Sequence, residues 1–401
     1  MHKYFKNYSY NLFSALLNIL SQIAILIYIN HIYGLELSGF FSVSIAITGP
    51  LFMFFNMQLK WLIATDVSSY RIEEYLVTRI LTSTIAVIFA IIFFVISSDI
   101  NLVWFFLCVS SFKFFESLSE IPYGFFQKQE DFKLIFLFSI FKAIGIFSIL
   151  FVDFFYKLTI NIIFYISILY ALSLLLEILN VNRVNKILFN KINSKFILNK
   201  IKISWKFGIV SFFVSLKTNI PRYFLSAMGL EKLAIFTTLN YLNYGSNFLF
   251  SSLGEVNNVK LSKNNIPPFK SIFNFILLSF LYSLFFLFFF ILFKNEIIFL
   301  LFGKNYFISL VLSITIFLSG FTSLSVLIIQ NYFMVYRFSN KLLFFNFLEI
   351  FLLLIFFFVN YLFLNLSIDF ILFIPILISS FFALLSFKSL KKNYINYVNE
   401  Y

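Results

Sequence analysis

The stretch WKFGIVSFFVSLKTNIPRYFLSAMG, residues 205–229, decides how the rest of the chain is interpreted. It is apolar enough to cross a bilayer as an α-helix, for which about 20 residues suffice. Yet Lys217 lies near its midpoint, and Pro221-Arg222 lies in its outer third. A cation at that depth is costly and usually faces a protein interior or a wet cavity, and a proline frees a carbonyl that a lipid-facing helix cannot easily satisfy. We therefore expect this helix to line a cavity.

The composition is that of a polytopic membrane protein. Of 401 residues, 61% are hydrophobic and only 12% are charged, a balance that soluble domains do not show. The formal charge of +13 does not indicate nucleic-acid binding, because the basic residues are scattered between apolar runs. The single cysteine, Cys108, excludes a disulfide within the chain. Lys3 and Lys6 precede an apolar run without a small-residue cleavage site, so we expect an uncleaved first span.

Windows of about 20 apolar residues predict twelve membrane spans and an all-α fold. The predicted spans are 9–29, 38–58, 77–97, 102–123, 134–153, 159–180, 206–228, 234–256, 271–293, 309–332, 343–364 and 368–387. The apolar piece 297–302, which ends in Gly303-Lys304-Asn305-Tyr306, is expected to be an outer re-entrant or surface segment.

The basic residues support this map, because inner loops of membrane proteins carry an excess of lysine and arginine. With the N-terminus inside, the outer segments hold only Lys157, Lys232, Lys294 and Lys304. The spans hold Lys113, Lys142, Lys217 and Arg222, and all other lysines and arginines fall on the inner side. This bias predicts that both termini are cytoplasmic.

A short repeat predicts two related halves. Gly34-Leu35-Glu36 follows the first span and Gly229-Leu230-Glu231 follows the seventh, an offset of 195 residues. Six spans per half is an even number, so the halves would be parallel repeats related by a pseudo-twofold along the membrane normal, typical of alternating access. We predict six-helix lobes over 1–182 and 206–392, a basic cytoplasmic linker over 183–205 and a cytoplasmic tail over 393–401. The linker is either an amphipathic helix on the inner leaflet or a loop that only fixes topology.

No motif for ATP hydrolysis, zinc binding or paired cysteines is present, so we expect no cofactor and no metal. The informative residues are charges within the spans. Lys113 and Glu116 have the three-residue spacing of a same-face pair. Lys142, Lys217 and Arg222 then remain against Glu349, a cationic balance that favours an anionic ligand. The alternative is that these cations form interhelical salt bridges or extend toward water.

Polar side chains of the eighth span are candidate sugar contacts. Asn240, Tyr244 and Asn247 recur at three- and four-residue steps with Thr237 and Ser251, which is one face of a helix. Gln22 lies 195 residues before Lys217 and extends the candidate set to the first half. Amides and hydroxyls at such positions also serve as interhelical hydrogen-bonding groups.

Two regions of the chain, residues 31–66 and 219–229, contain short segments that resemble a known family. The segment from His31 to Phe41, Gly49-Pro50 and the segment from Gln58 to Asp66 resemble the first two spans of polysaccharide-unit flippases (O-antigen, Wzx-type) of the multidrug/oligosaccharidyl-lipid/polysaccharide (MOP) exporter superfamily. The segment from Asn219 to Phe224, followed by Gly229, resembles the start of that family's second half. Lys60 departs from the pattern, since an arginine is more usual there and lysine lacks its planar fork.

The resemblance implies a MATE/MOP-like fold and a carrier, not an enzyme, in the bacterial plasma membrane. It would move undecaprenyl-pyrophosphate-linked oligosaccharide repeat units from the cytoplasmic to the outer leaflet for O-antigen or capsule synthesis. Lys217, Arg222 and Lys142 would hold the pyrophosphate or an acidic sugar, and Lys60 would make a contact at the cytoplasmic opening. The protein would be a monomer that works beside the polymerase and chain-length regulator of its pathway.

Two other functions are weighed against this one. A drug antiporter of the same superfamily would need acids deep in the first lobe, and the first three predicted spans contain none. A membrane-embedded polysaccharide polymerase would need long outer loops with catalytic arginines, which this chain lacks.

Overall fold

A computed structural model of the chain describes residues 2–65, 71–97, 103–157, 162–184, 194–241, 269–303, 309–335, 339–360 and 368–400, and its elements there are helices. Their packing divides the chain into two compact units, Met1–Ala234 and Ile235–Tyr401. Where the structure describes them, the twelve predicted spans fall on helices. Of the eighth span, 234–256, only residues 234–241 are described.

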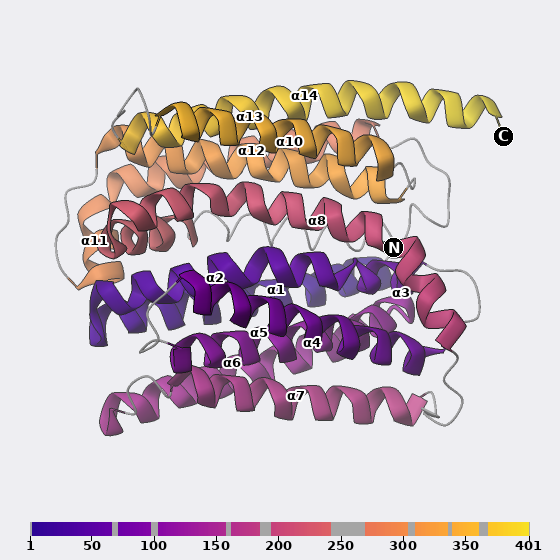
Figure 1. Cartoon of the computed structure of the whole chain (residues 1–401), viewed down its shortest axis with the longest axis horizontal. Helices are drawn as coiled ribbons and strands as arrows, with labels where there is room; N and C mark the ends of the chain where they lie inside the picture. The colour runs from indigo at the N-terminus through magenta and orange to yellow at the C-terminus, as the bar shows by residue number, and fades with distance from the viewer. Residues whose placement is uncertain are drawn as a thin grey trace. The chain divides into compact units, whose positions relative to one another are not determined.

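The first unit contains α1 to α8, whose long members lie side by side in Figure 1. Their bounds are α1 His2–Ile32, α2 Gly34–Asn56, α3 Leu59–Thr65, α4 Ile72–Ser97, α5 Val103–Lys128, α6 Phe132–Tyr156, α7 Ile162–Val184 and α8 Ser194–Met228. The main packing pairs are α1 with α6, α2 with α8, α5 with α7, and α4 with both α2 and α5. Helix α5 therefore lies at the centre of this unit.

Helix α6 shows how the spans are divided between core and lipid. Buried residues of α6 recur at three- and four-residue steps, at Ile135, Phe138, Lys142 and Ile146. On the opposite side, Ile144 and Phe151 are largely exposed. Large apolar side chains are exposed in the same way on α4 and α7. A soluble protein would not expose such stripes, so they are the lipid-facing surfaces of the unit.

Helices α2 and α8 approach each other so closely that glycine is required. A Cβ on Gly208 would lie 2.5 Å from the backbone oxygen of Phe54, and a Cβ on Gly39 would lie 2.8 Å from the carbonyl carbon of Leu230. Between these two contacts, a Cβ on Gly49 would lie 3.5 Å from Ser215 Oγ, which is an ordinary van der Waals distance. Residues 49 and 54 of α2 thus meet residues 215 and 208 of α8, and residue 39 meets Leu230, just beyond the end of α8. The chain from Gly208 to Leu230 therefore runs antiparallel to α2.

The repeated Gly-Leu-Glu segments share a backbone feature. Gly34 has φ +87° and is the first residue of α2. Gly229 has φ +131° and immediately precedes the helix that begins at Leu230. Positive φ is costly for residues with a Cβ, which explains why glycine stands at both turns. This common geometry supports the internal repeat.

The second unit contains helices α10 to α14, and Figure 1 shows its long members side by side. They are α10 Phe269–Leu292, α11 Lys294–Phe302, α12 Leu310–Val335, α13 Ser339–Val359 and α14 Ile368–Glu400. The apolar piece 297–302 lies in the short helix α11, which ends at Gly303 with φ +67°.

Among the described residues, eight helices are long and apolar enough to cross a membrane by length and composition. In the first unit, the long helices α5 and α8 are not among these eight, and both carry charged residues within their spans. These two helices are therefore the places to look for function.

Part of the segment predicted as a linker is helical. Residues 194–205 are the first turns of α8, and there Phe196 packs edge-on against buried Tyr75 of α4 while Lys200 lies 5.1 Å from the same ring. Helix α8 packs within the unit that ends at Ala234. The predicted lobes 1–182 and 206–392, with the linker and tail, remain predictions.

Candidate functional site in the first unit

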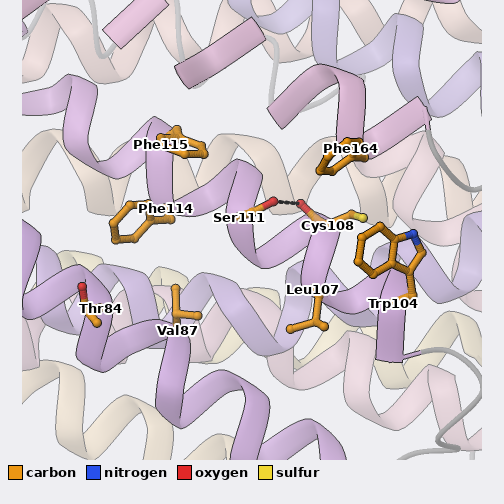
Figure 2. Close-up of a pocket in the computed structure, with 9 residues that line it drawn as sticks. All are labelled: Thr84, Val87, Trp104, Leu107, Cys108, Ser111, Phe114, Phe115 and Phe164. Atoms are coloured by element: carbon orange, nitrogen blue, oxygen red, sulfur yellow. Dashed lines mark hydrogen bonds between the residues drawn. The ribbon is translucent and has the colours of Figure 1, made fainter. Parts of the chain in front are cut away.

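Helix α5 has an outward apolar face. A groove of about 420 Å³ lies between α4, α5 and α7, and Figure 2 shows the aromatic side chains around it. It is lined by Thr84, Val87, Trp104, Leu107, Cys108, Ser111, Phe114, Phe115 and Phe164. Trp104 is 52% exposed, and the flanking stripes of α4 and α7 expose apolar side chains too. This face of α5 is therefore directed toward lipid.

The opposite face of α5 carries charge. Lys113 Nζ lies 2.6 Å from Glu116 Oε2, at the three-residue spacing noted in the sequence, and the two side chains are 19% and 33% exposed. Lys113 follows Trp104 by nine residues, which is two and a half helical turns. The Lys113–Glu116 pair thus lies on the side of α5 away from the groove.

One turn further along α5, Glu120 joins three helices. Its carboxylate accepts hydrogen bonds from Arg79 of α4 and from Asn56 Nδ2 of α2, the latter at 3.2 Å. Asn56 Oδ1 accepts from Ser117 at 2.7 Å, and Ser117 lies 2.9 Å from Ser83 Oγ. We call these five residues the Arg79–Glu120 cluster.

On another side of α5, Lys142 of α6 is almost fully enclosed. Its Nζ lies 2.9 Å from Glu177 Oε1 of α7, 3.1 Å from Tyr123 Oη and 3.4 Å from Ser119 Oγ. An ammonium group has three donors, and these three acceptors match them. The position favours the interhelical salt bridge, the alternative raised above, and substrate binding by Lys142 stays a prediction.

Helix α8 carries the two cations of the seventh span. Arg222 is buried and donates from Nη1 to Asn219 Oδ1 at 3.1 Å. Asn219 and Ser215 lie on the face that meets Gly49 of α2. Lys217, half-buried, is five residues from Arg222 and so points about 140° away from it on a regular helix. The two cations lie on different faces of α8.

The C-terminal end of α2 makes a polar contact with α8, and it is followed by Lys60, the lysine predicted to lie at the cytoplasmic opening. Gln58 Nε2 donates to Ser211 Oγ at 2.7 Å, which joins the chain just after α2 to α8. Met57 and Gln58 have φ +50° and +53°, so the chain turns sharply into α3. There the backbone of Lys60 lies against Gly124 of α5, where a Cβ would be 2.8 Å from the Lys60 oxygen.

The predicted sugar contacts that the structure describes fall in different units of the chain. Gln22 is half-buried in α1 of the first unit, and Asn240 is buried in the second. Tyr244 and Asn247 lie outside the described residues. Their role remains a prediction.

The sequence-based charge count needs correction. It placed Arg79 in an inner loop and omitted Glu120 and Glu177, whereas all three lie in helices that span the bundle. Helix α4, which contains the third predicted span, begins at Ile72, so this helix includes the buried acids Glu73 and Glu74. Spacing along one helix found Lys113 and Glu116, but pairs that join different helices leave no such signal.

The profile of the polysaccharide biosynthesis protein family matches residues 4–257. The chain belongs to this family. The capsular polysaccharide biosynthesis protein CapF of Staphylococcus aureus is 28% identical over 278 residues, which cover 64% of this chain and 66% of that relative. The alignment thus spans just under two thirds of the relative's length.

Solved structures agree on the fold of this polysaccharide biosynthesis protein. A mutant of the Vibrio cholerae MATE transporter VcmN gives a TM-score of 0.69 at 10% identity, with 98% of this chain and 96% of that chain covered. A MOP superfamily transporter from Pyrococcus furiosus gives 0.69 at 13% identity, with 97% and 95% covered. The predicted MATE-like fold, of twelve helices in two lobes, is confirmed, and the chain is a multi-pass membrane protein.

Proposed function

We propose that the protein is a flippase for undecaprenyl-pyrophosphate-linked oligosaccharide repeat units in surface polysaccharide synthesis. It moves them from the cytoplasmic to the outer leaflet of the bacterial plasma membrane, with both termini in the cytoplasm. The observation that carries this proposal is the combination of a polysaccharide biosynthesis family with a transporter fold. A carrier of this kind is not an enzyme, since no bond of the cargo changes.

The physical problem is to move a polar head through lipid while its hydrocarbon tail stays outside. Arg222 and Lys217 on α8 are the proposed contacts for the pyrophosphate or an acidic sugar, because both are cations within a membrane span. Lys60, in the first turn of α3, is the proposed contact at the cytoplasmic opening. Gln22, Asn240, Tyr244 and Asn247 are the proposed sugar contacts.

Alternating access between two lobes would expose these groups to one side of the membrane at a time. The protein acts as a monomer in this proposal, next to the polymerase and chain-length regulator that use its product.

Deletion in the native strain tests the proposal when surface polymer and lipid-linked intermediates are both analysed. We expect loss of polymer, with lipid-linked single units retained on the cytoplasmic face. Single units on the outer face would instead mean a polymerase. An unchanged surface with altered sensitivity to cationic compounds would mean a drug antiporter.

A further inference from the structure

We infer that the first turns of α8, residues 194–206, form a binding surface for anionic phospholipids of the cytoplasmic leaflet. Three lysines of this surface contact headgroup phosphates, and two apolar side chains enter the boundary between headgroups and acyl chains. The inference goes beyond the proposed function, because it concerns the surrounding membrane and not the cargo.

The first turns of α8 are held against one end of the first unit. Figure 1 shows them turning aside from the rest of α8 and lying across that end. Phe196 packs edge-on against Tyr75 in the first turn of α4, with the ring centroids 5.8 Å apart, and Lys200 lies 5.1 Å from the same Tyr75 ring. Ser204 is buried, and its hydroxyl lies 3.6 Å from Met57 Sδ at the end of α2. This inward face determines which residues face outward.

The outward face carries a strip of cations beside a strip of apolar side chains. Lys195, Lys202 and Lys206 are seven and four residues apart, so they share one side of the helix. Leu198 and Trp205 are also seven residues apart, and they lie about 70° around the helix axis from the lysine strip. Leu198 is 65% exposed and Trp205 is 42% exposed, and of the lysines only Lys206 is half-buried.

Such a face matches the surface of a membrane better than bulk water. An interfacial helix buries its leucine and tryptophan side chains at the boundary between headgroups and acyl chains, and tryptophan is enriched at that level. Lysine side chains extend along apolar surface and place their ammonium groups among the headgroups. No aspartate or glutamate occurs between residues 194 and 206, so the charge of this segment is positive throughout. The negative surface potential of anionic lipids attracts segments of this kind.

The spacing of the lysines favours phospholipids over a single pyrophosphate group. From Lys195 to Lys206 the helix rises about 16 Å, and the strip lies on an open face. Ammonium groups in such a row match several headgroups that lie side by side. The occupant is therefore the phospholipid of the bilayer and not the cargo.

Bound headgroups steady the cytoplasmic ends of two further helices. The Phe196 contact joins this surface to α4, and the Ser204 contact joins it to Met57 at the end of α2. Beyond residue 206 the same helix continues into the span that bears Lys217 and Arg222. Anionic lipid thus acts on the end of the helix that carries both proposed cargo contacts.

Fluorescence quenching by brominated lipids tests the inference on the full chain in lipid nanodiscs. The substitutions Trp61→Phe and Trp104→Phe leave Trp205 as the only tryptophan. Phosphatidylcholine nanodiscs receive increasing fractions of dibrominated phosphatidylglycerol in one arm and dibrominated phosphatidylcholine in the other. We expect half-maximal quenching at a phosphatidylglycerol fraction at least fivefold lower, because one lysine near an anionic surface contributes about fivefold in affinity.

Two matched pairs of exposed lysines separate this surface from general attraction to positive charge. The variant Lys195→Gln/Lys202→Gln should lose most of the preference for phosphatidylglycerol. The control Lys388→Gln/Lys391→Gln removes the same charge from α14 and should retain the preference. Sodium chloride at about 1 M should weaken the preference, because it shortens the Debye length to about 3 Å.

Equal quenching by the two lipids before the lysines are changed would overturn the inference, and so would the absence of quenching by either lipid. A preference lost equally in the control pair would also overturn it, because net charge and not this surface would then be responsible. If the tryptophan variants do not fold, native mass spectrometry of chains that keep all tryptophans compares the phosphatidylglycerol retained by the two lysine pairs. No cargo is present in these measurements, so their failure leaves the deletion phenotype of the proposed function untouched.

Discussion

Alanine at Gly39 should destabilise the first unit, although alanine is the better helix former. Replacing a helical glycine by alanine normally gains about 0.5–1 kcal/mol. At Gly39 the new methyl group meets the backbone of Leu230, with the carbonyl carbon at 2.8 Å, and backbone cannot rotate away. Overpacking of this kind costs about 1–3 kcal/mol, so we expect a net loss of about 1–2 kcal/mol.

Gly49 provides the matched control on the same helix. A methyl group there lies 3.5 Å from Ser215 Oγ and 3.7 Å from Asn219 Nδ2, which is ordinary contact. Gly49→Ala should change the free energy of unfolding by less than about 1 kcal/mol, because its methyl group meets no backbone atom and the steric restriction imposed by Pro50 offsets the gain in helix propensity. Reversible unfolding in mixed lipid–detergent micelles, titrated with dodecyl sulfate and followed by circular dichroism, measures both free energies. Equal stability of the two variants would refute the close approach of α2 to the backbone of Leu230.

Three further outcomes are expected. Lys142→Met should lower the free energy of unfolding by about 3–5 kcal/mol, because it leaves the Glu177 carboxylate buried without its cation. The double variant Lys142→Met/Glu177→Leu should recover most of this loss. A double variant as unstable as the single one would contradict this expectation. Tyr28→Phe should cost about 1–3 kcal/mol in the same assay, because its hydroxyl donates at 2.6 Å to a buried carboxylate of α6; an unchanged midpoint would count against that bond. Lys217→Ala and Arg222→Ala should each reduce surface polysaccharide about tenfold at normal protein levels, as loss of a charge-assisted contact implies; normal polymer in both variants would remove these residues from the site.

The sequence was sufficient to predict where helices lie, because each span is a long apolar window with its own local signal. Over the residues that the structure describes, the predicted spans coincide with helices between α1 and α14. The glycines at 34 and 229 were found as a repeat, and their positive φ values supply the physical reason.

Pairing between helices could not be predicted in the same way. Lys113 and Glu116 are three residues apart, so helical periodicity brings them together. Arg79 and Glu120 are 41 residues apart, and Tyr28 and Asp153 are 125 residues apart. Only the packing of α4 on α5 and of α1 on α6 reveals these contacts. The same packing gives Lys142 a partner in Glu177 that its position in the sequence does not suggest.

The most direct test of the account is translocation itself in reconstituted vesicles. The purified full chain is placed in liposomes that contain a fluorescent undecaprenyl-pyrophosphate oligosaccharide, and the fraction quenched by an impermeant reagent outside is followed over time. We predict that units initially protected inside become accessible faster with the protein than in empty liposomes, without ATP. Equal rates in the two preparations, with correctly folded protein, would contradict the central claim.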